Sequence, residues 1–264
     1  MLEILPLSFK ITYAIIIFVL GTVFGSFLNC LAWRLVHGGS VLKGRSQCPS
    51  CGHILSPLDL FPIISWICLR GKCRYCKTSI SGRYPLTELI LGILFLLGLL
   101  RLDISWELLF FLVFVSCLFT LTITDLDDFV IPDGCVITTM VSYLAYALIA
   151  RMPVQDVLTH ILAGLVLGGS VLGLSLIMDK MLKKETMGGG DIKLLAACGL
   201  VLGPVGALFM LLAACIIGLI FAYIIKLSKN DNGPIFPFGP SIALASTVMY
   251  LFGGGLVEWY LSFF

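Results

Sequence analysis

The sequence predicts an all-α membrane protein that crosses the bilayer with about eight helices and carries a small zinc-stapled subdomain between the first two. Three observations lead to this fold class. Of the 264 residues, 59% are hydrophobic and 12% are charged, whereas soluble domains have about 45–50% apolar and about 25% charged residues. The apolar residues gather in long blocks, as membrane-spanning helices require. A polar stretch with two Cys-x-x-Cys motifs interrupts these blocks after the first one.

The expected spans follow from the apolar blocks, because a helix needs about 20 apolar residues to cross a bilayer. The second and sixth blocks are shorter, and the sixth could instead be a re-entrant or half-buried element. Lys10 is the only basic residue before the first block, and no small-residue cleavage site follows the block, so we expect a span rather than a cleaved signal peptide. The blocks cover residues 11–33, 86–100, 106–124, 131–150, 157–178, 194–202, 205–225 and 238–256.

This pattern predicts three parts: a first helix within residues 1–33, a polar subdomain at 34–83 and a membrane bundle at 84–264. With the N-terminus outside, only Lys10, Arg101 and Arg151 of the 17 basic residues fall on the outer side. The positive-inside rule therefore makes the other side the cytoplasm. The formal charge of +2 gives no indication of a nucleic-acid partner. The expected surroundings are a lipid bilayer.

The motifs Cys48-Pro-Ser-Cys51 and Cys73-Arg-Tyr-Cys76 predict a structural zinc site. Each motif offers two thiolates from one tight turn, and structural zinc takes four nitrogen or sulfur ligands. We expect the loop in the reducing cytoplasm, where disulfides are rare, and a metal stabilises units too small for a sufficient core. Free or redox-active cysteines are the alternative. Four thiols complete the zinc shell, so we expect His53 at the surface.

Ionisable residues at membrane depth are functional candidates, because burying them there is costly. Asp125 ends the third block, Asp191 directly precedes the sixth, and Glu88 lies near the start of the second. Under the predicted topology both aspartates fall at cytoplasmic helix ends. A pair of nearby carboxylates can share one proton, so that one acts as a base and the other as an acid in peptide hydrolysis.

Three glycines, Gly188, Gly189 and Gly190, precede Asp191. They would allow positive φ angles and a close approach of a substrate strand to the carboxylate. The alternative is a flexible loop that ends in an aspartate N-cap of the next helix. Lys193 could be a snorkelling interfacial lysine or a charge partner of the two aspartates.

These motifs, in this order, resemble the bacterial type IV prepilin leader peptidases over most of the chain. The stretches that carry the resemblance are Gly25-Ser-Phe-Leu-Asn29, Arg45-Ser-Gln-Cys48-Pro-Ser-Cys51, Leu69-Arg-Gly-Lys-Cys73-Arg-Tyr-Cys76, Arg83-Tyr-Pro-Leu-Thr-Glu88, Asp125 with Ile131-Pro132-Asp133, Gly188-Gly-Gly-Asp191-Ile-Lys193 and Pro237-Phe-Gly-Pro240.

The resemblance implies a bacterial inner-membrane enzyme of the GxGD group of aspartyl proteases, with Asp125 and Asp191 as the catalytic pair and the four motif cysteines as zinc ligands. Such enzymes cut a short basic leader from type IV prepilin or pseudopilin precursors, after a glycine and on the cytoplasmic side. Members with a four-cysteine loop also N-methylate the new N-terminus with S-adenosylmethionine. The resemblance associates such enzymes with type IV pili, type II secretion and competence.

No glycine-rich signature for a methyl donor is visible, so the donor site rests on single polar residues. Each of these could equally be a packing polar group or an interfacial charge. The candidates for binding S-adenosylmethionine are Ser26, Asn29, Arg34, Arg45, Arg70 and Glu88.

Two functions from other classes compete with the peptidase. A transporter would use intramembrane acids as ion ligands, but it predicts acids at mid-span, where this chain is almost purely apolar. A non-catalytic scaffold would explain the cysteine loop but not the glycine-led aspartate.

Overall fold

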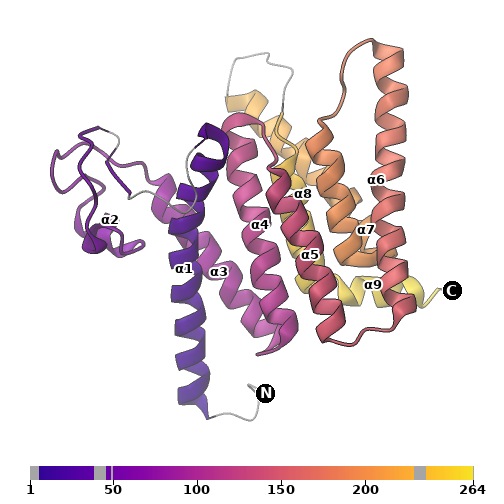
Figure 1. Cartoon of the computed structure of the whole chain (residues 1–264), viewed down its shortest axis with the longest axis horizontal. Coiled ribbons are helices and arrows are strands. Elements are labelled where there is room, and N and C mark those ends of the chain that lie inside the picture. The colour runs from indigo at the N-terminus through magenta and orange to yellow at the C-terminus, as the bar shows by residue number, and fades with distance from the viewer. Residues whose placement is uncertain (1–5, 39–45, 49, 229–235, 264) are drawn as a thin grey trace. The chain divides into compact units, whose positions relative to one another are not determined.

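The computed structural model describes residues 6–38, 46–48, 50–228 and 236–263 (Figure 1). Within these ranges the chain is helical, and the extended pairing is limited to two isolated β-bridges in the cysteine loop. The predicted all-α class is therefore confirmed. The chain forms two compact units, Met1–Thr120 and Leu121–Phe264. The three-part division predicted from the sequence remains a prediction.

The first unit is built on a pair of closely packed helices, α1 and α3. Glycines allow this approach: a Cβ on Gly21 would lie 2.8 Å from Cα of Gly92, and a Cβ on Gly25 would lie 2.8 Å from Cα of Glu88. Small residues at such contacts let membrane helices pack backbone to backbone. The helices of this unit are α1 (Leu7–His37), η2 (Pro57–Asp59), α2 (Ile64–Cys68), α3 (Arg83–Leu102) and the start of α4 (Trp106–Asp128).

The second unit begins with the last turns of α4, and its packing centres on α7, which contacts α5, α6 and α8. Gly164 and Gly168 on α6 face α7, where an added Cβ would lie 2.6 Å from the Ala196 carbonyl oxygen and 2.7 Å from Ala196 Cβ, respectively. The remaining helices of the unit are α5 (Asp133–Ile149), α6 (Val154–Leu182), α7 (Gly189–Ser228), α8 (Gly239–Phe252) and α9 (Gly254–Leu261).

Helix α7 is broken in its first half. As a straight helix its 40 residues would measure about 60 Å, twice the thickness of the hydrocarbon core. Gly203 has a non-helical backbone (φ 70°, ψ −178°), and Pro204 has no N–H to donate to the Leu200 carbonyl one turn earlier. His160 of α6 replaces that donor, with Nδ1 3.0 Å from the Leu200 oxygen.

The chain reverses direction at this break. Residues on both sides of it, Val201 and Gly206, line a pocket with Met249 near the end of α8. Farther along, Gly218 packs against Phe238 at the start of α8, where an added Cβ would lie 3.0 Å from the ring. The second arm of α7 therefore runs antiparallel to α8, and the first arm runs parallel to it.

Five described helices are long and apolar enough to cross a membrane, and the α8–α9 pair, bent by 73°, can supply a sixth span. The apolar helix α5 is shorter, at 17 residues. With the two arms of α7 counted separately, the described chain contains the eight apolar segments that the sequence predicts. The predicted sixth and seventh blocks are these two arms, which meet at the break at Gly203.

Candidate active site

Asp125 lies in the last full turn of α4 and is only 5% exposed. Its carboxylate reaches the start of α8, where Oδ2 accepts a hydrogen bond from the backbone N–H of Gly239 at 2.9 Å. One turn later the helix ends at Phe129, whose φ of 55° is left-handed and whose N–H donates to the Asp125 carbonyl. The end of α4 thus fixes Asp125 at a buried helix N-terminus, which favours a negative group.

Asp191 lies in the first turn of α7 and is partly buried. Its carboxylate is close enough to that of Asp125 for the two to interact electrostatically. Its Oδ1 atom is buried and has no hydrogen-bond partner among the residues described. The structure therefore brings together the two aspartates that the sequence singled out, from helices separated by about sixty residues of chain.

The glycines before Asp191 act differently from the expectation. None of Gly188, Gly189 and Gly190 has a positive φ, so the predicted left-handed backbone is wrong. Gly190 is instead required for packing, because a Cβ there would lie 2.9 Å from Cβ of Ile131. The N-cap alternative for Asp191 is also wrong, since α7 already begins at Gly189.

Lys193 contacts neither aspartate of the pair in the recorded hydrogen bonds and ion pairs. Its Nζ lies 2.8 Å from Oδ1 of Asp133, the first residue of α5, and both side chains are largely exposed. This ion pair joins the start of α5 to the start of α7. Lys193 is therefore a charge partner of Asp133 and not of Asp125 or Asp191.

Two residues at this site were not predicted as functional residues from the sequence. Gly239 appeared only inside the stretch Pro237-Phe-Gly-Pro240, and Ile131 only beside Pro132. Neither carries a reactive group, so the available signal was the repeated occurrence of glycine and proline beside apolar blocks. Their roles depend on contacts across 114 residues in one case and about 59 in the other.

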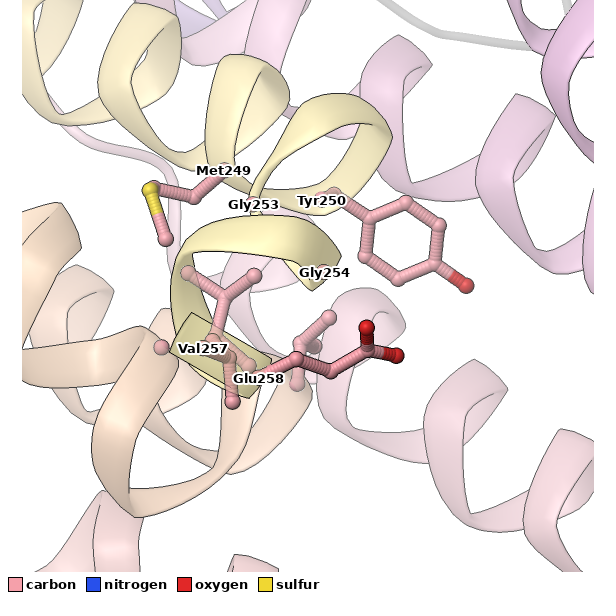
Figure 2. Close-up of a pocket in the computed structure, with 9 residues that line it drawn as sticks. Met249, Tyr250, Gly253, Gly254, Val257 and Glu258 are labelled. Carbon is pink, nitrogen blue, oxygen red and sulfur yellow. The ribbon is translucent and has the colours of Figure 1, made fainter. Parts of the chain in front are cut away.

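A surface pocket in the second unit lies away from the two aspartates (Figure 2). It has a volume of about 310 Å³ and is formed where α7 breaks and α8 ends, with Tyr250 and Glu258 among its lining residues. It shares no lining residue with the aspartate pair and lies at the opposite end of α8 from Gly239. We therefore assign the candidate active site from the carboxylates and not from this cavity.

In the first unit, the thiols of Cys48, Cys51, Cys73 and Cys76 gather within 4.8 Å of one another and could hold a metal ion. A tetrahedral zinc site with bonds of about 2.3 Å needs sulfur separations of about 3.8 Å, and Cys48 and Cys76 are 3.9 Å apart. Hydrogen bonds from the side chain and backbone of Thr78 lower the pKa of Cys76 to about 6, whereas burial and the neighbouring Cys76 and Cys48 thiols raise the pKa of Cys51 to about 11. The position of the four sulfur atoms is therefore the evidence for a metal site, and not the protonation of the metal-free thiols.

The two cysteine motifs have the same local geometry. The N–H groups of Gly52 and Lys77, each directly after the second cysteine of its motif, donate to the carbonyls of Cys48 and Cys73 at 2.8 and 3.0 Å. Gly52 and Lys77 both have left-handed φ angles, of 68° and 62°. Each turn is closed by an isolated β-bridge, Gln47 with Ile54 and Lys72 with Ser79. The repeated turn presents two thiols from each motif to a common centre.

An ion pair ties this loop together. The side chain of Asp59 is 4% exposed, and its Oδ1 lies 2.6 Å from Nε of Arg74, inside the second cysteine motif. Burial raises the pKa of Asp59, but hydrogen bonds from Arg74, Ser56 and Tyr75 outweigh it and lower the pKa to about 2. His53 is exposed at the surface, as predicted, and its ring lies against Tyr75, with 3.6 Å between the ring centroids.

The candidates for the methyl donor do not form one group. Ser26, Asn29 and Glu88 lie together between α1 and α3: Glu88 accepts hydrogen bonds from the Ile63 N–H at 2.7 Å and from Ser26. Asn29 donates to the Thr87 hydroxyl at 2.6 Å and to the Gly25 carbonyl. The others are scattered or undescribed: Arg34 is half-buried on α1, Arg70 is exposed with a left-handed φ of 52°, and Arg45 lies outside the described residues.

Comparison with known proteins gives the family of the chain. The family models for the bacterial peptidase A24 N-terminal domain and for the type IV leader peptidase family match residues 19–102 and 112–223. A prepilin leader peptidase/N-methyltransferase of Aeromonas salmonicida is 35% identical over 84% of this chain and 76% of the relative. One from Bacillus subtilis is 34% identical over 94% of this chain and 97% of the relative.

A type 4 prepilin-like proteins leader peptide-processing enzyme of Escherichia coli is 33% identical over 85% of this chain and 88% of the relative. No solved structure matches the chain. The two family models cover the cysteine loop and both aspartates, and the similarity extends over most of the length of these relatives. The chain is a member of the type IV leader peptidase family.

Proposed function

We propose that this protein is an aspartic endopeptidase that removes the short basic leader from type IV prepilin-like precursors. The observation that carries the proposal is the pair of carboxylates, Asp125 and Asp191, close enough to interact at the ends of two membrane helices. The names of the relatives supply the substrate class. The acids lie at helix ends and not at mid-span, which also argues against a transporter.

The pair can hydrolyse a peptide bond without a covalent intermediate. Two neighbouring carboxylates cannot both be ionised cheaply, so the pair holds one proton. The ionised member takes a proton from a water molecule, whose oxygen attacks the scissile carbonyl carbon. The protonated member donates its proton to the carbonyl oxygen, and the tetrahedral intermediate then collapses as a proton passes to the leaving amine and the C–N bond breaks.

We infer that cleavage takes place after a glycine, at the cytoplasmic face of a bacterial inner membrane. The precursor would insert its apolar segment beside the second unit and leave its basic leader in the cytoplasm. The distribution of lysines and arginines supports this orientation, with the N-terminus of the enzyme outside. Lys193, through Asp133, and Gly190, through Ile131, would support the first turn of α7 that carries Asp191, and Gly188 and Gly189 lead into this turn.

We further propose that the protein N-methylates the new N-terminus with S-adenosylmethionine, as the names of its relatives suggest. When bound, this donor would supply an electrophilic methyl group on a sulfonium cation. A buried carboxylate suits a cation, and Glu88 is 7% exposed beside Ser26 and Asn29. These three residues are the ones that would hold its charged end. Arg34, Arg45 and Arg70 are proposed as further donor-binding residues from the family resemblance alone, and Arg45 lies outside the described residues.

We propose zinc as the metal of the four-cysteine cluster, with a structural role. All four donors are thiols, which leaves no open position for a catalytic water. The metal would hold the two turns of the loop together, and residues 34–83 would form the subdomain associated with methyl transfer.

The proposal is tested by incubating the purified protein in detergent with a prepilin and a methyl-labelled donor, followed by mass analysis of both fragments. We expect a single cut after the glycine, followed by a gain of one methyl group on the mature fragment. A missing cut would contradict the peptidase, whereas a cut without methylation would contradict only the second activity. A precursor whose glycine is replaced by a bulky residue serves as the control.

A further inference from the structure

The first turn of α8 presents the backbone N–H of Gly239 to Asp125, and the neighbouring residues explain why. N–H groups in the first turn of a helix have no partner within the helix. Here Pro240 has no N–H, and the N–H groups of Ser241 and Ile242 donate to the Phe238 carbonyl at 3.0 and 3.2 Å. The N–H of Gly239 remains, and it donates to Oδ2 of Asp125 at 2.9 Å.

Gly239 also leaves the space that the Asp125 carboxylate occupies. A Cβ at this position would lie 2.7 Å from Oδ2, 3.2 Å from Cγ and 3.4 Å from Cβ of Asp125. The backbone itself does not demand glycine, because the φ angle of Gly239 is not positive. The need for glycine here is therefore steric, and the group that imposes it is the carboxylate.

The other member of the pair is held differently. Asp191 has a buried Oδ1 without a recorded hydrogen-bond partner, and its nearest glycine contact is loose, with a Cβ on Gly188 3.4 Å from Oδ2. Asp125 is thus the fixed carboxylate. Because a backbone N–H can only donate, the Oδ2 atom of Asp125 must act as an acceptor whenever this hydrogen bond is present.

We propose that Gly239 is a positioning residue for Asp125. Its N–H donates to Oδ2 and so keeps this oxygen as an acceptor. Because Gly239 has no side chain, the carboxylate can lie against the start of α8. Proton exchange with water then runs through Oδ1 of Asp125 and through Asp191. This inference rests on the proposed peptidase function. It assigns a task to a residue that has no reactive group of its own.

The first experiment replaces Gly239 by alanine and by serine and measures kcat and KM for precursor cleavage. We expect kcat to fall at least 100-fold with Gly239→Ala and further with Gly239→Ser, while KM changes less than threefold. Gly134→Ala is the matched control, because Gly134 also lies in the first turn of a helix but an added Cβ meets nothing within 4 Å. A kcat of Gly239→Ala within threefold of wild type would overturn the proposal.

The second experiment does not depend on activity or on the stability of a Gly239 variant. In protein labelled with ¹⁵N-glycine, the amide proton of Gly239 should move upfield in Asp125→Ala, because its acceptor is lost, while that of Gly134 stays in place. An unmoved Gly239 signal would overturn the hydrogen bond. If the wild type cleaves no precursor but the Gly239 signal moves, the proposed function fails and the positioning contact stands.

Discussion

Each of the two units of this membrane protein buries carboxylates, but the units differ in the hydrogen bonds that these carboxylates accept. In the first unit, Glu88 accepts hydrogen bonds from the Ile63 N–H and from Ser26. In the second unit, Asp125 has one recorded backbone donor, and the buried Oδ1 of Asp191 has none among the described atoms. A buried polar group without a partner costs free energy, so such groups are retained where chemistry needs them. Two donors thus hold Glu88 in the first unit, whereas the fewer donors around Asp125 and Asp191 suit the proton transfer that we propose for this pair.

The Glu88 contact also holds a strained turn. Ile63, a β-branched residue, has φ 61° and ψ −53°, and the Ile64 N–H donates to the Pro62 carbonyl across it. This is a γ-turn of the rare kind that costs of the order of 1–3 kcal/mol in a non-glycine residue. The hydrogen bond from Ile63 to Glu88 joins the turn to α3 and offsets part of that cost.

The largest effect should come from the aspartate pair. We expect Asp125→Asn and Asp191→Asn each to lower kcat for precursor cleavage by about 10³-fold or more, because proton transfer at both sites contributes of the order of 10²–10⁴. Cleavage is followed by the shift in precursor mass. Both variants should still insert into membranes and methylate a precut peptide. If either variant processed the precursor normally, the substituted aspartate would not be a catalytic residue.

Loss of the metal should have the next largest effect, confined to the first unit. Cys48→Ser leaves three thiols, so we expect bound zinc, measured by mass spectrometry of the metal, to fall well below one ion per chain. The loop should then be cut faster by added protease, because the ligand turns lose their common centre. Cys198→Ser, a buried cysteine outside the cluster, is the control. Unchanged cleavage and methylation together with full zinc content would show that Cys48 is not a ligand.

The third largest effect is expected from Glu88, whose substitution should affect stability and not precursor cleavage. Glu88→Ala leaves the Ile63 N–H without its acceptor and should lower the free energy of unfolding by about 1–3 kcal/mol, measured by denaturant titration in detergent. Precursor cleavage should stay within about twofold of wild type. Glu88→Gln keeps an acceptor oxygen and should cost less. A loss of cleavage comparable with Asp125→Asn would break the contrast between the two units.

A smaller effect is expected from the Asp59–Arg74 ion pair. Because the pKa of Asp59 is lowered to about 2, its stabilisation is complete above the unfolded value near 4 and disappears as the pH falls through about 2. Asp59→Asn should cost about 1 kcal/mol at pH 7, a value discounted because Arg74 is half exposed. Protease sensitivity of the loop provides the measurement. Arg74→Met in the Asn variant should add little further loss.

The smallest effect should come from Lys193 and Asp133. Both side chains are more than half exposed, so a double-mutant cycle on Lys193→Met and Asp133→Asn should give a coupling of at most about 1 kcal/mol. Cleavage should fall only a few-fold. A loss as large as that of Asp191→Asn would mean that Lys193 acts in the chemistry and not only in joining α5 to α7.

The amino-acid sequence by itself determined the membrane class, the apolar segments, the four-thiol motif and the two aspartates as candidates. These follow from composition, run length and short-range spacing, which act through local chain geometry and through transfer from water to lipid. The separation of the blocks 194–202 and 205–225 at Gly203 and Pro204 has the same local origin, because a glycine followed by a proline interrupts a helix through its own backbone geometry.

Only the tertiary structure decided which groups meet. The contact of Gly239 with Asp125, the packing of Gly190 on Ile131 and the pairing of Glu88 with Ile63 join residues far apart in the chain. The sequence around a glycine does not indicate which atom would collide with an added Cβ. Likewise, the sequence around a carboxylate does not indicate which donors will surround it. Those partners are set by helix packing, which positions backbone atoms from distant segments to within a few tenths of an ångström.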